Sequence, residues 1–144
     1  MARIPDPQHG LVISYAYLWQ RDATQSREEG TKYRPAVVVL AVESDDEHGK
    51  IVLVAPITHR KPDDPTTGVE IPPLTKRRLG LDPERSWVIV SEVNRFEWPG
   101  PDLVPVAPGQ WAYGILPAGL FRIVRDRLAG LARQRKLAQV RREP

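Results

Sequence analysis

Residues 32–42, KYRPAVVVLAV, and residues 51–60, IVLVAPITHR, decide the fold of this chain. Both segments are rich in β-branched residues, which favour strands. The connection between them is acidic and includes a glycine, which is typical of a hairpin turn. The first strand of an antiparallel hairpin begins beside the end of the second strand. We therefore expect Arg34 to lie close to Thr58 and His59.

The rest of the chain is expected to extend this β structure and to end in a helix. Fifteen prolines and ten glycines in 144 residues favour short strands and turns over a helical bundle. A strand that begins at Ser86 is expected to run on to Trp98. The predicted fold class is mainly β with a C-terminal helix (α+β), a small barrel of strongly curved antiparallel strands closed by that helix.

The expected division of the chain is a single domain, residues 1–144, in three parts. Residues 1–9 are expected to form an extended arm, and residues 10–116 the β-barrel core. Apolar residues recur at helical spacing after Pro117, which predicts a basic amphipathic helix over residues 117–138. We expect the end of this helix to fray.

The composition excludes several classes of protein. The chain has no cysteine, so it has neither disulfides nor a thiolate nucleophile or metal ligand. It has no apolar segment long enough to span a bilayer and no apolar signal sequence, so we expect a cytoplasmic location. It also lacks a glycine-rich phosphate loop, a nucleophile elbow and metal-ligand spacing. We therefore expect no metal and no cofactor.

The charge is unevenly distributed along the chain. The formal net charge is +3, yet residues 122–144 carry eight Lys or Arg and two Asp or Glu. A basic tail of this kind attracts nucleic acid or an acidic protein segment. A solvated helix face explains the same pattern, so charge alone does not predict nucleic-acid binding.

An arginine before a proline at the start of a strand is the first candidate functional group. Pro35 favours extended backbone at Arg34. The guanidinium fork of Arg34 suits a phosphate and the charge that develops on it during cleavage. The hydroxyl of Thr58 suits donation to a phosphate oxygen. Each residue alone also fits an ordinary strand end, and it is their expected convergence that favours a phosphate site.

Two residues are candidates for the proton transfer that phosphate cleavage requires. His59 has a side chain that titrates near neutral pH, which suits general acid–base catalysis. Glu92 lies within a predicted strand, where a half-buried carboxylate can act as a base. The common alternatives are an exposed histidine at a strand end and a carboxylate paired with Lys or Arg.

Five segments follow one another in an order that is found in a known family. They are GLVI at 10–13, Trp19, KYRPAVVV at 32–39, APIT at 55–58 and SWVIVSEVNRF at 86–96. In this order they resemble the PemK/MazF-like family of toxin endoribonucleases from bacterial type II toxin–antitoxin modules. The resemblance extends over about residues 9–130, and its most specific part is the Arg-Pro strand followed by Pro-Ile-Thr.

The resemblance implies a small SH3-like barrel that forms a homodimer and cleaves single-stranded RNA, such as mRNA, without a metal. The ribose 2′-hydroxyl attacks the adjacent phosphate and leaves a 2′,3′-cyclic phosphate and a 5′-hydroxyl. Arg34 and Thr58 match the family residues that surround this phosphate. A cognate acidic antitoxin protein is the implied partner. Four residues are expected to contact the RNA: Trp19, Lys32, Arg60 and Asn94.

The chain departs from the family at one pair of positions. Some members carry an Arg and an Asp spaced two residues apart on the later strand, where this chain has Val90 and Glu92. Because the Arg is absent, we infer that His59 or Glu92 moves the proton. The main alternative is a catalytically inactive barrel that binds RNA or a protein. A toxin of the same fold that inhibits DNA gyrase is a third interpretation.

Overall fold

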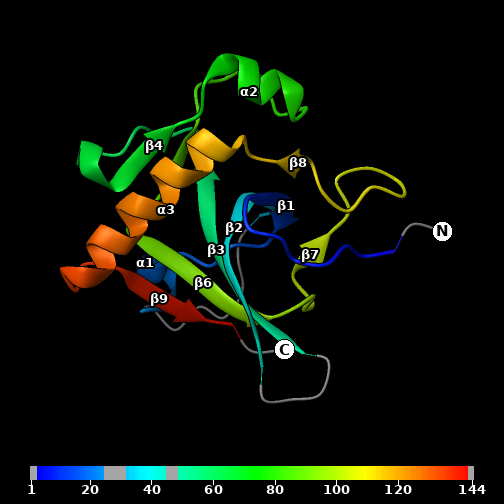
Figure 1. The fold of residues 1–144 in the computed structure, drawn as a ribbon, viewed down its shortest axis with the longest axis horizontal. Coiled ribbons are helices and arrows are strands. Elements are labelled where there is room, and N and C mark those ends of the chain that lie inside the picture. Colours follow the sequence, from blue (N-terminus) through cyan, green and yellow to red (C-terminus); the bar gives the residue numbers. More distant parts are fainter. Residues whose placement is uncertain (1–2, 25–31, 45–48, 143–144) are drawn as a thin grey trace.

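The computed structural model describes residues 3–24, 32–44 and 49–142, and it shows a strongly curled sheet with a long helix against it (Figure 1). The start of the predicted arm (1–2) and most of the predicted hairpin connection (45–48) lie outside the described residues. The strands are β1 (Leu11–Tyr15), β2 (Arg34–Glu43), β3 (Lys50–Thr58), β4 (Gly68–Glu70), β5 (Trp87–Ile89), β6 (Glu92–Glu97), β7 (Leu103–Val104), β8 (Gly114–Ile115) and β9 (Ala138–Arg141). The helices are α1 (Gln20–Ala23), the 3-10 turn η1 (Pro65–Thr67), α2 (Pro73–Arg78) and α3 (Ala118–Arg133).

The predicted hairpin is confirmed as the antiparallel pair β2–β3. Ala36 lies opposite Pro56, and the same register continued by two residues brings Arg34 level with Thr58. A bulge at Val39 shifts the register and adds twist, which helps the sheet to curl. The expected convergence of the two strand ends is therefore present.

The sheet curls because β3 changes partner along its length. Its first half pairs with β6, and its last two residues pair with β5. The continuous strand predicted from Ser86 to Trp98 is therefore wrong, since Val90 and Ser91 interrupt it. All pairs are antiparallel except β6–β9. The mainly β fold class with strongly curved antiparallel strands is confirmed, and the sheet is curled without closing on itself.

The central strands bury both faces, which explains why their sequences are continuously apolar. Val37 and Val39 face a cluster that includes Val124 of α3. Ala36 and Val38 face the opposite cluster, in which Tyr15 stacks on Phe96 with ring centroids 4.7 Å apart. Two-sided burial of β2 fixes its register, and with it the position of Arg34 at its start.

The C-terminal helix ends earlier than predicted. Arg135 adopts a left-handed conformation with φ of 58°, a position usually taken by glycine. The N–H groups of Arg135 and Lys136 close the helix by donating to the carbonyls of Ala132 and Leu131. The expected frayed end is instead the strand β9, which pairs in parallel with β6.

In the part of the chain that the structure describes, none of the helices combines the length and the apolar character that a membrane span requires.

Candidate functional site

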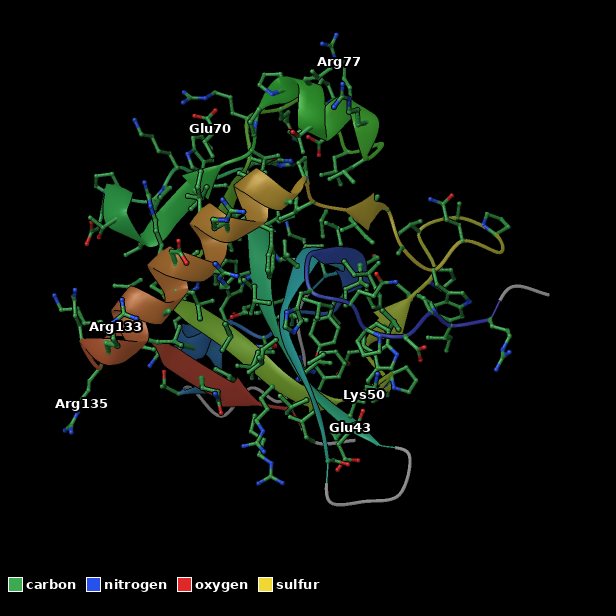
Figure 2. The ribbon with its side chains drawn as sticks, in the orientation of Figure 1. Glu43, Lys50, Glu70, Arg77, Arg133 and Arg135 are labelled. Carbon is green, nitrogen blue, oxygen red and sulfur yellow. The ribbon has the colours of Figure 1, made fainter. Side chains whose placement is uncertain are left out.

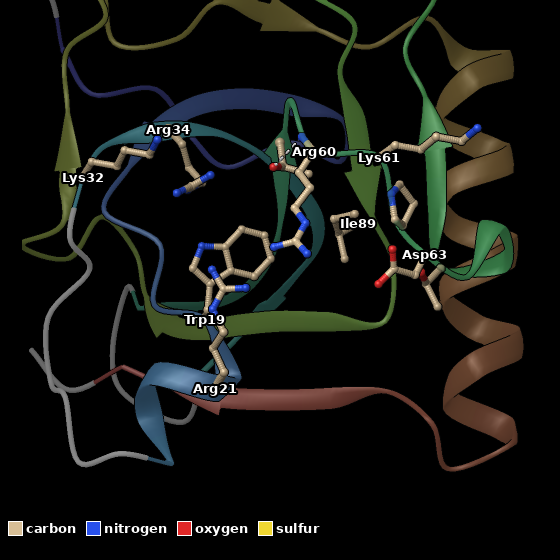
Figure 3. A pocket seen from close by; sticks show the side chains of 11 residues that line it. Trp19, Arg21, Lys32, Arg34, Arg60, Lys61, Asp63 and Ile89 are labelled. Atoms are coloured by element: carbon tan, nitrogen blue, oxygen red, sulfur yellow. Dashed lines mark hydrogen bonds between the residues drawn. The ribbon is translucent and has the colours of Figure 1, made fainter.

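Two adjacent cavities lie at the end of the hairpin where β2 begins and β3 ends. The first, of about 430 Å³, is the cationic cavity (Figure 3), and the second, of about 400 Å³, is the His59 cavity. Four side chains line both cavities: Lys32, Arg34, Thr58 and Arg60. Within the described residues, the cationic cavity is lined by five cationic side chains and one carboxylate, that of Asp63. This charge balance suits an anionic ligand.

Arg34 is half-buried beside the first cavity, and its charge is incompletely compensated. Its Nε atom is buried and has no hydrogen-bond partner among the described residues. Burial, together with the charge of Arg21, lowers the pKa of Arg34 below its ordinary value. A half-buried guanidinium with an unpaired donor gains stability when an anion lies beside it and compensates its charge. Because Arg34 lines both cavities, its guanidinium is placed to bind a phosphate there.

Trp19 lies next to the two arginines of the cationic cavity. The guanidinium carbons of Arg34 and Arg21 lie 5.1 and 5.3 Å from the centre of its ring, within the range of cation–π attraction. Figure 3 shows both guanidinium groups close to the indole. Because Trp19 is only partly buried, its ring offers a stacking surface beside a cationic group.

Two polar residues of β6, Glu92 and Asn94, form a latch that holds the backbone on both sides of Trp19. The Asn94 amide accepts a hydrogen bond from the Leu18 N–H (2.9 Å) and donates one to the Leu18 carbonyl (2.8 Å). Glu92 Oε1 accepts hydrogen bonds from the Tyr17 hydroxyl (3.1 Å) and from the backbone N–H of the residue after Trp19 (3.0 Å). The latch therefore sets the position of the indole.

The latch corrects the expectation that Asn94 contacts RNA. Asn94 has no exposed surface, and both ends of its amide are bonded to the backbone of Leu18. Glu92 lines neither cavity. Burial raises the pKa of Glu92, although the hydrogen bonds that it accepts from Gln20 and Tyr17 act against this shift. Val90 is completely buried in the core.

Thr58, Lys32 and Arg60 line both cavities together with Arg34. Thr58 is partly exposed, and its hydroxyl oxygen accepts a hydrogen bond from the Arg60 N–H at 3.2 Å. The hydroxyl hydrogen therefore remains available to a ligand. Lys32 and Arg60 are exposed cations beside it. The fold thus brings together three cations, a hydroxyl donor and the Trp19 ring.

His59 lines the second cavity and contacts two carboxylates, those of Asp82 and Glu84. Its Nε2 lies 2.7 Å from Asp82 Oδ2, and its Nδ1 lies 3.2 Å from Glu84 Oε2. The buried Lys76 donates to the other oxygen of Asp82 at 2.8 Å. These residues come from α2 and the loop after it, so their approach to His59 depends on tertiary structure and leaves no signal in the sequence.

The His59 cluster is the part of the described chain that most resembles a metal site. One ligand atom from each of His59, Asp82 and Glu84 lies within 4.8 Å of the others. The spacing of these three residues in the sequence does not indicate a metal site, because His59 is distant from the two carboxylates. The ammonium of Lys76, bonded to Asp82, opposes the binding of a second cation.

Comparison with known proteins gives one family. The model of the PemK-like, MazF-like toxins of type II toxin–antitoxin systems matches residues 17–97, which is more than half of the chain. The matched range includes the hairpin, Trp19, the two cavities' shared residues and the latch. No curated protein matches the chain. The chain therefore belongs to the family of PemK-like, MazF-like toxins of type II toxin–antitoxin systems.

Proposed function

We propose that this toxin is an endoribonuclease that cleaves single-stranded RNA without a metal. In this reaction the ribose 2′-hydroxyl attacks the adjacent phosphate, giving a 2′,3′-cyclic phosphate and a 5′-hydroxyl. The observation that carries the proposal is the buried, unsatisfied Nε of Arg34 beside Thr58 in a cavity rich in cations. Family membership supports the same conclusion.

Each shared residue has a role in this reaction. Arg34 binds a non-bridging phosphate oxygen and stabilises the added charge of the five-coordinate state. Thr58 donates its hydroxyl to the same phosphate. Lys32 and Arg60 attract the neighbouring phosphates, and Trp19 stacks on an unpaired base.

His59 is better placed than Glu92 to move the proton. The cavity that contains His59 is also lined by Arg34 and Thr58. Glu92 lines neither cavity, and it already accepts two hydrogen bonds from the segment around Trp19. We assign His59 to catalysis and Glu92 to the support of Trp19.

Steady-state cleavage of an RNA oligonucleotide in EDTA tests the proposal. Arg34→Ala should lower kcat by about 10²–10³-fold, the usual loss when one electrostatic contact to the transition state is removed. Arg95→Ala is the matched control, because Arg95 is exposed on β6 and lines neither cavity. Equal activity of Arg34→Ala and the wild-type protein would disprove the role of Arg34.

A second candidate function is binding without catalysis. The position at which some family members carry an Arg is Val90, and this residue is completely buried in the core. If the protein lacks a substitute for that Arg, the same cavities bind RNA or a protein segment without cleaving it. Retention of intact RNA at high protein concentration would favour this function.

We further propose a homodimer that works in the cytoplasm and is held inactive by an acidic antitoxin. The basic surface of α3 and the residues after it provides a site for such a partner, and Figure 2 shows Arg133 and Arg135 projecting from the end of this helix. Sedimentation of the purified protein tests the dimer. Salt-sensitive binding of the acidic product of a neighbouring reading frame tests the partner.

A further inference from the structure

The buried ammonium of Lys76 is the least expected group near the site. Lys76 is only 4% exposed, although it lies on a helix at the surface of the fold. It donates to Asp82 Oδ1 at 2.8 Å, to the Ser86 hydroxyl at 2.6 Å and to the Glu84 carbonyl. All three donors of the ammonium therefore have acceptors, which compensates for the cost of its burial.

Lys76 fixes the carboxylate of Asp82. Asp82 Oδ1 accepts hydrogen bonds from Lys76 and from the Glu84 N–H at 3.1 Å, and Oδ2 faces His59 Nε2 at 2.7 Å. Partial burial acts to raise the pKa of Asp82, but hydrogen bonds from Lys76 and His59 reverse the shift and lower it. The carboxylate is thus held in its ionised form and in one orientation.

The two contacts of His59 differ in strength. A neutral imidazole has only one N–H, so only an imidazolium donates to Asp82 and Glu84 at the same time. The contact to Asp82 is short, at 2.7 Å, whereas that to Glu84 is 3.2 Å and the Glu84 side chain is 70% exposed. A substrate entering the cavity displaces Glu84 more readily than Asp82, which leaves the Nδ1–H of His59 available.

We propose that His59 is the general acid of the cleavage reaction and that Asp82, anchored by Lys76, is its positioning residue. This inference rests on the proposed endoribonuclease function. The bond from the 2′-oxygen to phosphorus forms while the bond from phosphorus to the 5′-oxygen breaks. His59 Nδ1 gives its proton to the departing 5′-oxygen, and the 2′-hydroxyl proton passes to solvent water. The imidazole then regains a proton from water.

A divalent metal at His59, Asp82 and Glu84 is the competing use of the same cluster. Such an ion would have to share Asp82 with an ammonium that lies 2.8 Å from it and is almost inaccessible to solvent. The repulsion between these two cations favours proton transfer over metal binding. The experiment below includes the metal as an outcome.

Single and double variants of the full-length protein test the general acid, His59, and its positioning residue, Asp82. In EDTA, His59→Ala should lower kcat by about 10²–10³-fold, within the range for general acid catalysis. Asp82→Asn should lower kcat by up to about 100-fold with little change in KM, because the acid is misplaced while binding is retained. The double variant should be no slower than His59→Ala. Glu70→Gln is the control, since Glu70 is also an exposed carboxylate in an ion pair, with Arg85.

A substrate with sulfur in place of the bridging 5′-oxygen gives a readout that a purely structural role would not change. A thiolate leaves without a proton, so this substrate should restore His59→Ala and Asp82→Asn to nearly wild-type rates and leave Arg34→Ala inactive. His59→Ala removes a half-exposed side chain and leaves the Lys76–Asp82 pair in place, so it remains informative if Asp82→Asn unfolds.

The outcomes separate this inference from the proposed function. An active wild-type protein, an inactive Arg34→Ala variant and a fully active His59→Ala variant would overturn the general acid alone. Loss of wild-type activity in EDTA with recovery on adding Mn²⁺ would also overturn it, in favour of a metal. A wild-type protein that leaves RNA intact would overturn the proposed function and, with it, this inference.

Discussion

The latch supports Trp19 in the cationic cavity, the cluster surrounds His59 in the second cavity, and each contains a carboxylate within reach of a candidate functional residue. Glu92 of the latch is half-buried and bonded to the chain at both sides of Trp19. Asp82 of the cluster is half-exposed and bonded to an imidazole that lines a cavity. We therefore propose that Glu92 supports Trp19, whereas Asp82 positions the imidazole that lines the cavity and transfers the proton.

The strongest test of this contrast compares single variants of the two candidates for proton transfer, Glu92 and His59. Glu92→Gln should retain kcat within about twofold, since Gln keeps an oxygen that accepts from Tyr17 and Gln20. His59→Ala should lose about 10²–10³-fold. Cleavage of one RNA oligonucleotide by both variants checks this. The reverse result, an inactive Glu92→Gln and an active His59→Ala, would move the chemistry to the latch.

The next largest effect is expected in stability. Asn94→Leu leaves the N–H and the carbonyl of Leu18 buried without partners, each at a cost of about 1–3 kcal/mol. The free energy of unfolding in urea should fall by about 2–6 kcal/mol, and RNA binding should weaken because Trp19 loses its support. Unchanged stability would show that the latch is not structural. Gln139→Leu, which replaces an exposed side-chain amide on β9, is a surface control.

A smaller effect should appear in binding when the stacking surface is removed. Trp19→Ala should weaken RNA binding by about 1–3 kcal/mol, the usual loss for one stacked base. The change should appear in KM, with kcat largely retained, because the role we propose for Trp19 is to stack on a base and not to contact the reacting phosphate. Trp111→Ala, which removes a partly buried indole that lines neither cavity, is the comparison. A loss confined to kcat would contradict stacking.

The smallest predicted effect concerns the pH dependence of stability. The folded-state pKa of Glu92 is raised, so the stability that its protonated form contributes is fully present below the unfolded pKa of about 4.3. This contribution is lost as the pH rises through the folded pKa. The melting temperature of Glu92→Gln should therefore increase relative to that of the wild-type protein as the pH rises. A constant difference between the two would contradict a buried, ionising Glu92.

The sequence predicts the core of the site because local rules govern it. The antiparallel hairpin places Arg34 level with Thr58, and the Arg-Pro start of β2 is visible without a structure. The break between β5 and β6 at Val90 is not predictable in this way, because it arises where β3 changes its partner strand. The end of α3 is also not predictable from the sequence, because Arg135 takes the left-handed position that a glycine would usually occupy.

The supporting residues are the part of the site that only the fold reveals. Asn94 bonds to Leu18 across 76 residues of sequence, and Asp82 reaches His59 from a loop after α2. The far end of the hairpin, where Figure 2 shows Glu43 and Lys50, follows the same strand pattern and borders a cavity of about 520 Å³. There the arginines are matched by carboxylates, since Arg95 and Arg141 line the cavity with Glu43 and Glu97. Strand pattern alone therefore does not indicate which end of the hairpin is functional.

The most direct test of the central claim is the chemistry of the RNA ends. Mass spectrometry of one single-stranded RNA, incubated in EDTA with the wild-type protein and with Arg34→Ala, measures those ends and the rate together. The account predicts 2′,3′-cyclic phosphate and 5′-hydroxyl ends from the wild-type protein and almost no cleavage by the variant. Intact RNA with the wild-type protein, 5′-phosphate ends, or equal cleavage by Arg34→Ala would contradict it.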